Sequence, residues 1–207
     1  MPKKPVEQTD LKEDCVRAAH QFIAENGVEA LSLREVARRL GVSHQAPYKH
    51  YPNRDYLLSE VMRRCFKDFA DFLDARELHE APEEDLASLG RQYLTYAANH
   101  ALEYRLMFGT PWPDVAEEVG LVRDAVHSFD VLRSVLRRTY SNRPDETAVD
   151  LDAMFIWSSL HGLASITQSN VMGHLNLSAK AIFAVPEHIR SRIRSALQQQ
   201  QTTQRSK

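Results

Sequence analysis

The sequence has 207 residues, which at roughly 150 residues per domain corresponds to one or two domains with a substantial buried core. Its 26 Lys and Arg residues against 28 Asp and Glu residues give a net charge of −2, which excludes a uniformly basic, histone-like protein. A hydrophobic fraction of 43% excludes a wholly disordered chain. Because there are only 7 Gly and 9 Pro residues, the composition favours helices, and we predict an all-α fold.

The cysteine content and the termini narrow the class of protein further. Two cysteines, Cys15 and Cys65, form neither a disulfide scaffold nor a paired-cysteine metal motif, so we expect reduced, partly buried thiols. The first residues lack the apolar segment of a signal peptide, and we expect a cytoplasmic protein. Residues 153–179 are uncharged but too rich in Ser, His and Asn to span a membrane. We therefore expect no membrane contact and place this segment in the fold or in a subunit interface.

The first two predicted helices have clear apolar faces and clear ends. The first helix ends at residues 26–27, and its apolar face contains Leu11, Cys15, Ala18, Ala19, Phe22 and Ile23. The second helix begins at Ser32, because Ser32 and Glu35 have the spacing of a capping box. Gly41 is placed to end it.

The remaining predicted elements are also helical. Ser43 is expected to cap a short helix over 44–51, which ends at Pro52, and a long helix then begins at Asp55. Pro186 is expected to break the last helix, and residues 198–207 are expected to form a disordered tail or a frayed helix end. Four further helical stretches are predicted at 83–108 with a break near His100, 114–140, 145–170 and 178–200.

Residues 31–54 have the pattern of a helix-turn-helix, with two short helices joined by a Gly-Val-Ser turn. In this motif the second helix enters the major groove of DNA. The segment has a net charge of +4, whereas residues 55–90 have a net charge of −6. A local positive charge on an acidic chain favours contact with phosphates. The alternative is an ordinary helical hairpin with a solvated charged face.

The same segment resembles a known family. Residues 11–60, with LSLREVARRLGVS and YKHYPNRDYLL, resemble the DNA-binding domain of TetR-family transcriptional regulators. QYLTYAANHALEYRLMFG (92–109) and FIWSSLHGLASI (155–166) resemble the subgroup named for a Trp-His-Gly signature. The resemblance implies an N-terminal three-helix helix-turn-helix domain over 1–54. It also implies a larger C-terminal helical domain for ligand binding and dimerisation over 55–207, with the helix from Asp55 as connector.

The resemblance also implies which residues contact a double-stranded DNA operator. His44, Gln45 and Ala46 are expected to face base edges, where Gln pairs with adenine and Ala meets a thymine methyl group. Phosphate contacts are expected from Tyr48, Lys49, His50, Arg54 and Ser32. For His50, local packing is an equal alternative. The small core of this domain is expected to contain Val36, Ala37, Leu40, Val42 and Tyr51.

The C-terminal half is expected to bind a small-molecule effector and to form a homodimer through the last two helices. The side chains expected to line the effector pocket are Tyr93, Tyr104, Phe108, Trp112, Met154, Trp157 and His161. Three of these share one helical face, namely Met154, Trp157 and His161. The alternative is ordinary core packing around a hydrogen-bonded histidine, and for the last helices an intramolecular core.

Other classes of function have little support in the sequence. We find no GxSxG, HExxH, P-loop or GxGxxG motif, and the nine His residues show no metal-ligand spacing. We therefore expect no enzyme, with no catalytic residue, metal or cofactor. The expected function is a ligand-responsive repressor that a small, mostly apolar effector releases from a palindromic operator. The alternatives are an enzyme and a DNA-binding structural protein without a ligand.

Overall fold

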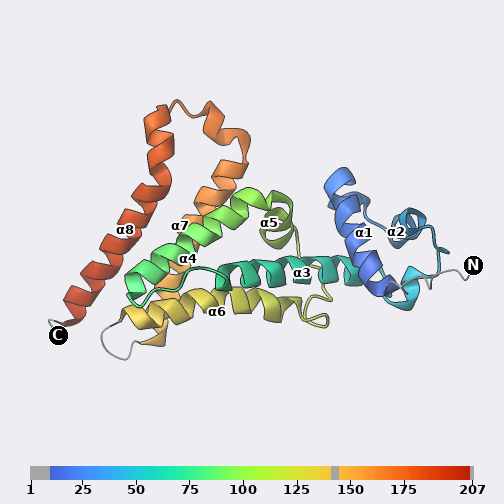
Figure 1. The fold of residues 1–207 in the computed structure, drawn as a ribbon, viewed down its shortest axis with the longest axis horizontal. Helices are drawn as coiled ribbons and strands as arrows, with labels where there is room; N and C mark the ends of the chain where they lie inside the picture. Colours follow the sequence, from blue (N-terminus) through green and yellow to red (C-terminus); the bar gives the residue numbers. More distant parts are fainter. Residues whose placement is uncertain (1–9, 141–144, 206–207) are drawn as a thin grey trace, which may run out of the picture. The chain divides into compact units, whose positions relative to one another are not determined.

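The computed structural model describes residues 10–140 and 145–205 of the chain. All regular elements in these residues are helices, which confirms the predicted all-α class (Figure 1). In chain order they are α1 (Leu11–Asn26), η1 (Val28–Ala30), α2 (Leu33–Leu40), η2 (Pro47–Lys49), α3 (Arg54–Asp74), α4 (Pro82–Asn99), α5 (Ala101–Phe108), α6 (Leu121–Thr139), α7 (Glu146–Gln168), η3 (Asn170–His174) and α8 (Ala179–Arg205).

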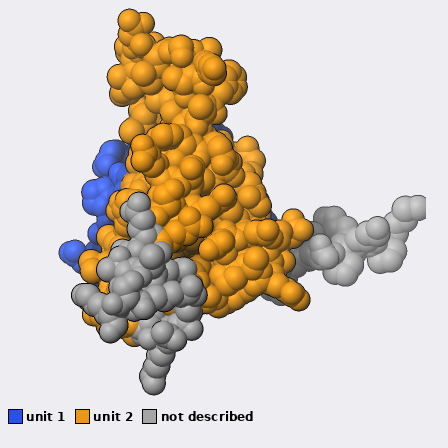
Figure 2. Space-filling view, turned by 90° about the vertical axis from the view of Figure 1, so that its left-hand side faces the viewer, with its two compact units in different colours: residues 1–67, 105–125 blue, residues 68–104, 126–207 orange. Residues whose placement is uncertain are grey.

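The chain divides into two compact units, coloured separately in Figure 2. The N-terminal unit contains residues 1–67 and 105–125, and the C-terminal unit contains residues 68–104 and 126–207. Helix α3 therefore contributes residues to both units. The domain division after residue 54 stays a prediction.

In the N-terminal unit, the predicted ends and faces of the first two helices are confirmed. The predicted apolar face of α1 is buried, with Cys15, Ala19 and Ile23 fully enclosed. Ser32 caps α2, since its hydroxyl oxygen accepts the Glu35 backbone N–H at 3.3 Å. Such a cap stabilises a helix by about 1 kcal/mol.

Gly41 ends α2 in the way its position in the sequence predicts. It adopts a left-handed conformation with φ of 67°, which residues other than Gly and Asn rarely adopt. The Gly41 N–H donates to the Arg38 carbonyl at 3.3 Å, and the Val42 N–H donates to the Ala37 carbonyl at 3.1 Å. This pair of hydrogen bonds is a Schellman motif, which stops the helix and turns the chain.

The short helix expected over 44–51 is not an α-helix. Residues 44–46 form turns, and only residues 47–49 form a 3-10 helix, η2. Most hydrogen bonds here join residues three apart, as from the His50 N–H to the Pro47 carbonyl at 3.0 Å, and one joins the Tyr51 N–H to the same carbonyl at 3.0 Å. Pro47 has no N–H to donate to the preceding turn, which favours this tighter geometry.

The stretch expected to form one helix over 114–140 begins later than predicted, with α6 starting at Leu121. Residues 114–120 form a separate turn that ends at Gly120, where φ is 78°. The Leu121 N–H donates to the Ala116 carbonyl at 3.0 Å and the Gly120 N–H to the Glu117 carbonyl at 3.1 Å. A second Schellman motif therefore interrupts the helical pattern that the sequence suggests.

In the C-terminal unit, the break expected near His100 is confirmed, because α4 ends at Asn99 and α5 begins at Ala101. The break expected at Pro186 is wrong, since Pro186 lies inside α8. Proline removes one backbone hydrogen bond from a helix interior, but α8 continues and packs against α4 and α7. It extends through residues 198–205, which we expected to be a tail.

A buried ion-pair cluster holds the loop between α3 and α4 in the C-terminal unit. Asp85 is fully buried and accepts hydrogen bonds from Arg76 Nε at 3.2 Å and Arg138 Nη1 at 2.7 Å. Arg138 also donates to the carbonyls of His79 and Glu80 at 2.9 and 3.1 Å. The carboxylate therefore joins the start of α4 to the end of α6.

Candidate nucleic-acid interface

The segment between α2 and α3 presents a row of exposed polar side chains. His44, Gln45, Lys49 and His50 are exposed, and Tyr48 is 48% exposed. Within the part of the chain that the structure describes, these five side chains have no hydrogen bond or ion pair. Their polar atoms are therefore free to bind a ligand in solution, as base and phosphate contacts require.

Two buried residues hold this segment against the domain. Pro47 and Tyr51 are buried, and they are four residues apart in the sequence. The Tyr51 hydroxyl donates to the Lys12 carbonyl at 3.2 Å, which ties the segment to α1. Burial raises the pKa of Tyr51 well above its usual range, so the hydroxyl stays protonated and can donate. The exposed side chains are thus carried on a fixed support.

Ala46 is half-buried, and Ser32 and Arg54 are also placed partly inside the domain. The Ser32 hydroxyl is engaged in the cap of α2. Arg54 Nη2 donates to the Val28 carbonyl at 2.8 Å, and Arg54 Nε donates to the Leu31 carbonyl at 3.1 Å. These contacts join α3 to the loop before α2. The phosphate contact expected of Arg54 stays a prediction, beside this structural role.

The basic residues of α2 differ in how far they are neutralised. Arg38 lies 2.7 Å from Glu35, and Arg39 Nη1 donates to Glu25 at 2.9 Å. Arg34 is exposed and forms no ion pair with the described residues. Arg34 contributes to the positive charge of residues 31–54, although no DNA contact is predicted for it from the sequence. Arg34 lies outside the apolar face of α2, and this position together with its charge predicts a further phosphate contact.

The C-terminal unit contains a chain of polar aromatic residues that includes three of the seven predicted effector contacts. The hydroxyl groups of Tyr93 and Tyr104 lie 2.7 Å apart, and the Tyr104 hydroxyl lies 2.7 Å from Nδ1 of His161. Burial raises the pKa of Tyr93 to about 12 and lowers the pKa of His161, so His161 is neutral at physiological pH. Its Nδ1 shares one hydrogen bond with the Tyr104 hydroxyl, whose direction is set by the imidazole tautomer.

Trp157 extends this cluster through its contact with His161, whereas Met154 is largely exposed. The Trp157 ring lies 5.9 Å from the His161 ring, as measured between centroids, and the same distance from Phe129. Met154 is 46% exposed. The structure thus gathers Tyr93, Tyr104, Trp157 and His161 in the C-terminal unit.

Phe108 and Trp112 belong to the N-terminal unit. Both pack edge-on against Phe66, with ring centroids 5.5 and 5.6 Å away, and the Trp112 indole donates to the Met107 carbonyl at 3.1 Å. Phe108 is half-buried and Trp112 is 41% exposed, so these contacts hold both rings against the buried Phe66 near the surface of that unit. Their role in effector binding stays a prediction.

No helix within residues 10–140 and 145–205 is long and apolar enough to cross a membrane. The same residues contain no group of three or more His, Cys, Asp or Glu side chains arranged to hold a metal ion.

The fold and the exposed segment after α2 together define a helix-turn-helix protein with a larger helical C-terminal part. Comparison with known families makes this specific. Residues 16–61 match the family described as bacterial regulatory proteins, tetR family, and residues 86–185 match the tetracyclin repressor-like, C-terminal domain. The chain therefore carries both domains of a TetR-family regulator.

Individual proteins are similar to this chain in sequence or in fold. The HTH-type transcriptional regulator Rv1816 of Mycobacterium tuberculosis is 29% identical over 101 residues, which are 47% of this chain and 43% of that protein. The match thus spans less than half of that relative's length. The crystal structure of SCO4313 aligns with a TM-score of 0.69 and 26% identity, covering 90% of this chain and 98% of that one. A protein from Rhodococcus sp. RHA1 aligns with a TM-score of 0.71 and 23% identity, covering 95% and 98%.

Proposed function

We propose that the chain is a ligand-responsive, DNA-binding repressor of transcription. The observation that carries this proposal is the row of exposed side chains at residues 44–50, which have no internal partners and stand on a buried Pro47 and Tyr51. His44, Gln45 and Ala46 read base edges. Tyr48, Lys49 and His50 bind phosphates, with help from Arg34.

The proposed regulator acts as a homodimer through α7 and α8, so that two copies read two half-sites of a palindromic operator about 34–36 Å apart. An exposed apolar stripe on α7 supports this assembly, since Leu151, Phe155 and Ile166 are 66%, 45% and 45% exposed and lie on one side of the helix. Gly162 lies on the same side, and a Cβ atom there would have no neighbour within 4 Å. A second copy would cover this stripe.

The proposed effector is a small, mostly apolar molecule that binds at the aromatic cluster of Tyr93, Tyr104, Trp157 and His161. It releases the operator by binding the conformation that cannot bind DNA more tightly than the one that can. The cluster offers apolar rings together with one hydrogen-bonding imidazole, as ligand sites commonly do. Assignment of the C-terminal domain to the Trp-His-Gly subgroup belongs to the same proposal and rests on residues 155–166.

The test is selection of bound fragments from a pool of genomic DNA by the purified protein, followed by anisotropy titrations on the selected site and its base variants. We expect Gln45→Ala to change the preference among base variants, and Tyr48→Phe to weaken all of them equally. Gln21→Ala, an exposed glutamine of α1, is the matched control and leaves binding unchanged. Absence of salt-dependent binding to any duplex would refute the proposal.

A further inference from the structure

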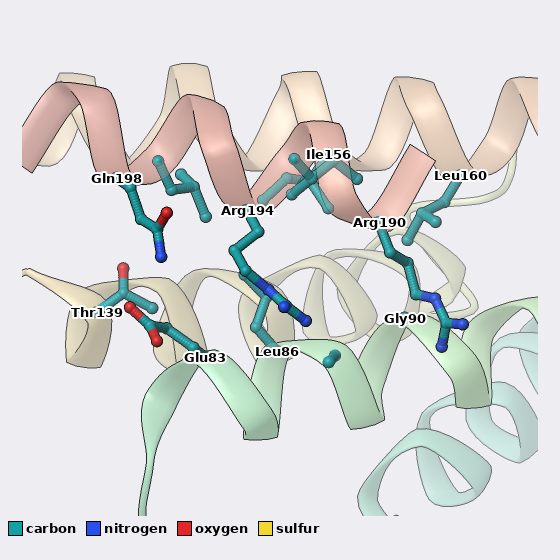
Figure 3. A pocket seen from close by; sticks show the side chains of 12 residues that line it. Glu83, Leu86, Gly90, Thr139, Ile156, Leu160, Arg190, Arg194 and Gln198 are labelled. Carbon is teal, nitrogen blue, oxygen red and sulfur yellow. The ribbon is translucent and has the colours of Figure 1, made fainter. Parts of the chain in front are cut away.

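A groove lies between α4, α7 and α8 of the C-terminal unit (Figure 3). None of the side chains predicted to bind the effector lines it. Its interior volume is about 50 Å³, which is room for on the order of four water-sized groups. The apolar part of its lining comes from Leu86, Ala87, Ile156, Leu160, Ile193 and Leu197.

Two arginines of α8 make one wall of this groove positive. Arg190 and Arg194 are one helical turn apart, and both side chains extend from α8 toward α4 in Figure 3. Arg194 has no acidic side chain of the described residues within ion-pair distance. Arg190 pairs with the exposed Glu187 through Nη2, but its buried Nε has no hydrogen-bond partner. A buried donor without a partner is costly, and a bound anion would satisfy it.

The polar groups of the groove are arranged unequally along its length. Glu83, Thr139 and Gln198 lie together at one end, and Arg190 lies at the other. A negatively charged group is therefore repelled from the Glu83 end and attracted to the arginines. The planar guanidinium groups match the two oxygens of a carboxylate.

We propose that this groove binds an unbranched aliphatic carboxylate, with its head group at Arg190 and Arg194 and its chain along the apolar floor. The enclosed volume accepts a few methylene groups, and the groove is partly open to solvent, so the rest of a longer chain lies along its open part. This site is additional to the effector site of the proposed function and does not depend on DNA binding.

Calorimetric titration of the full chain with octanoate, and in parallel with 1-octanol, tests the proposal. We expect octanoate to bind, and Arg194→Gln to weaken it about tenfold, as loss of a charged hydrogen bond predicts. Ala87→Leu fills the floor and abolishes binding. Arg192→Gln, an exposed arginine of α8 outside the groove, and Ala98→Leu, an exposed alanine of α4, are matched controls that keep wild-type affinity.

Equal binding of octanoate and 1-octanol, equal affinity of Arg194→Gln and wild type, or no octanoate binding would each overturn the proposal. Operator titrations on the same variants separate it from the proposed function. Octanoate binding without DNA binding would refute only the regulator, and DNA binding without octanoate binding would refute only the groove.

Discussion

Arg54 is the residue for which a structural role and a DNA-binding role make opposite predictions. Its guanidinium donates to the carbonyls of Val28 and Leu31 at 2.8 and 3.1 Å. A hydrogen bond from a charged group contributes about 1.5–3 kcal/mol. The Arg54 side chain is 34% exposed, so water replaces part of what is lost. We therefore expect Arg54→Gln to lower the free energy of unfolding by about 2 kcal/mol in total.

Two assays on the same variant distinguish the two roles. Urea denaturation measures the free energy of unfolding, and operator affinity at several salt concentrations measures the number of phosphate contacts. Each lost phosphate contact reduces the slope of log affinity against log salt by about 0.9. If the role of Arg54 is structural, its variant loses stability and keeps the slope.

Lys49→Gln is the matched comparison, because Lys49 is exposed and has no partner among the described residues. It should keep the stability of the wild type and reduce the salt slope by about 1.8, because the proposed dimer carries two copies of Lys49. If Arg54→Gln instead reduced the slope with no change in unfolding free energy, the assignment of Arg54 to the loop before α2 would be wrong.

Three more predictions follow from the described contacts. Asp85→Asn leaves Arg76 and Arg138 without a buried counter-charge and should lower the free energy of unfolding by about 3 kcal/mol. Adding Arg76→Met to the same chain should restore part of this loss, and an unchanged urea midpoint in Asp85→Asn would contradict the prediction. Gly41→Ala meets no atom within 4 Å but must adopt a left-handed conformation, so it should cost about 1 kcal/mol. Burial lowers the pKa of His161 from 6.5, so the unfolded chain binds the proton more tightly than the folded chain. The free energy of unfolding should therefore fall as the pH drops below about 6.5, and it should fall less in His161→Gln. Parallel pH profiles of the two proteins would count against this.

Features fixed by neighbouring residues could be predicted from the sequence. Ser32 caps α2 and Gly41 stops it, because each acts on backbone groups within four positions of itself. The buried face of α1 follows from its periodicity for the same reason. Pro186 shows the limit of such rules, since the packing of α8 against α4 and α7 outweighs the hydrogen bond that proline removes.

The parts of the candidate sites that involve distant residues could not be predicted in this way. Arg54 meets the carbonyl of Val28 only because the loop before α2 folds back onto α3. The groove beside Arg194 requires α4 to meet α7 and α8, which lie far from it in the sequence. The pairing of Tyr104 with His161 likewise joins residues 57 positions apart. Periodicity identifies which side of each helix is apolar but not which helix it meets.

Both cysteines of the chain lie in the N-terminal unit, and both are buried. Burial also raises the pKa of the Cys15 thiol to about 11, which keeps it protonated and unreactive in the native state. Alkylation of either sulfur therefore requires local opening of the buried core around it. The rate at which a thiol reagent labels the protein thus reports local opening of the DNA-binding half alone, so operator binding can be followed as protection from labelling without any introduced probe.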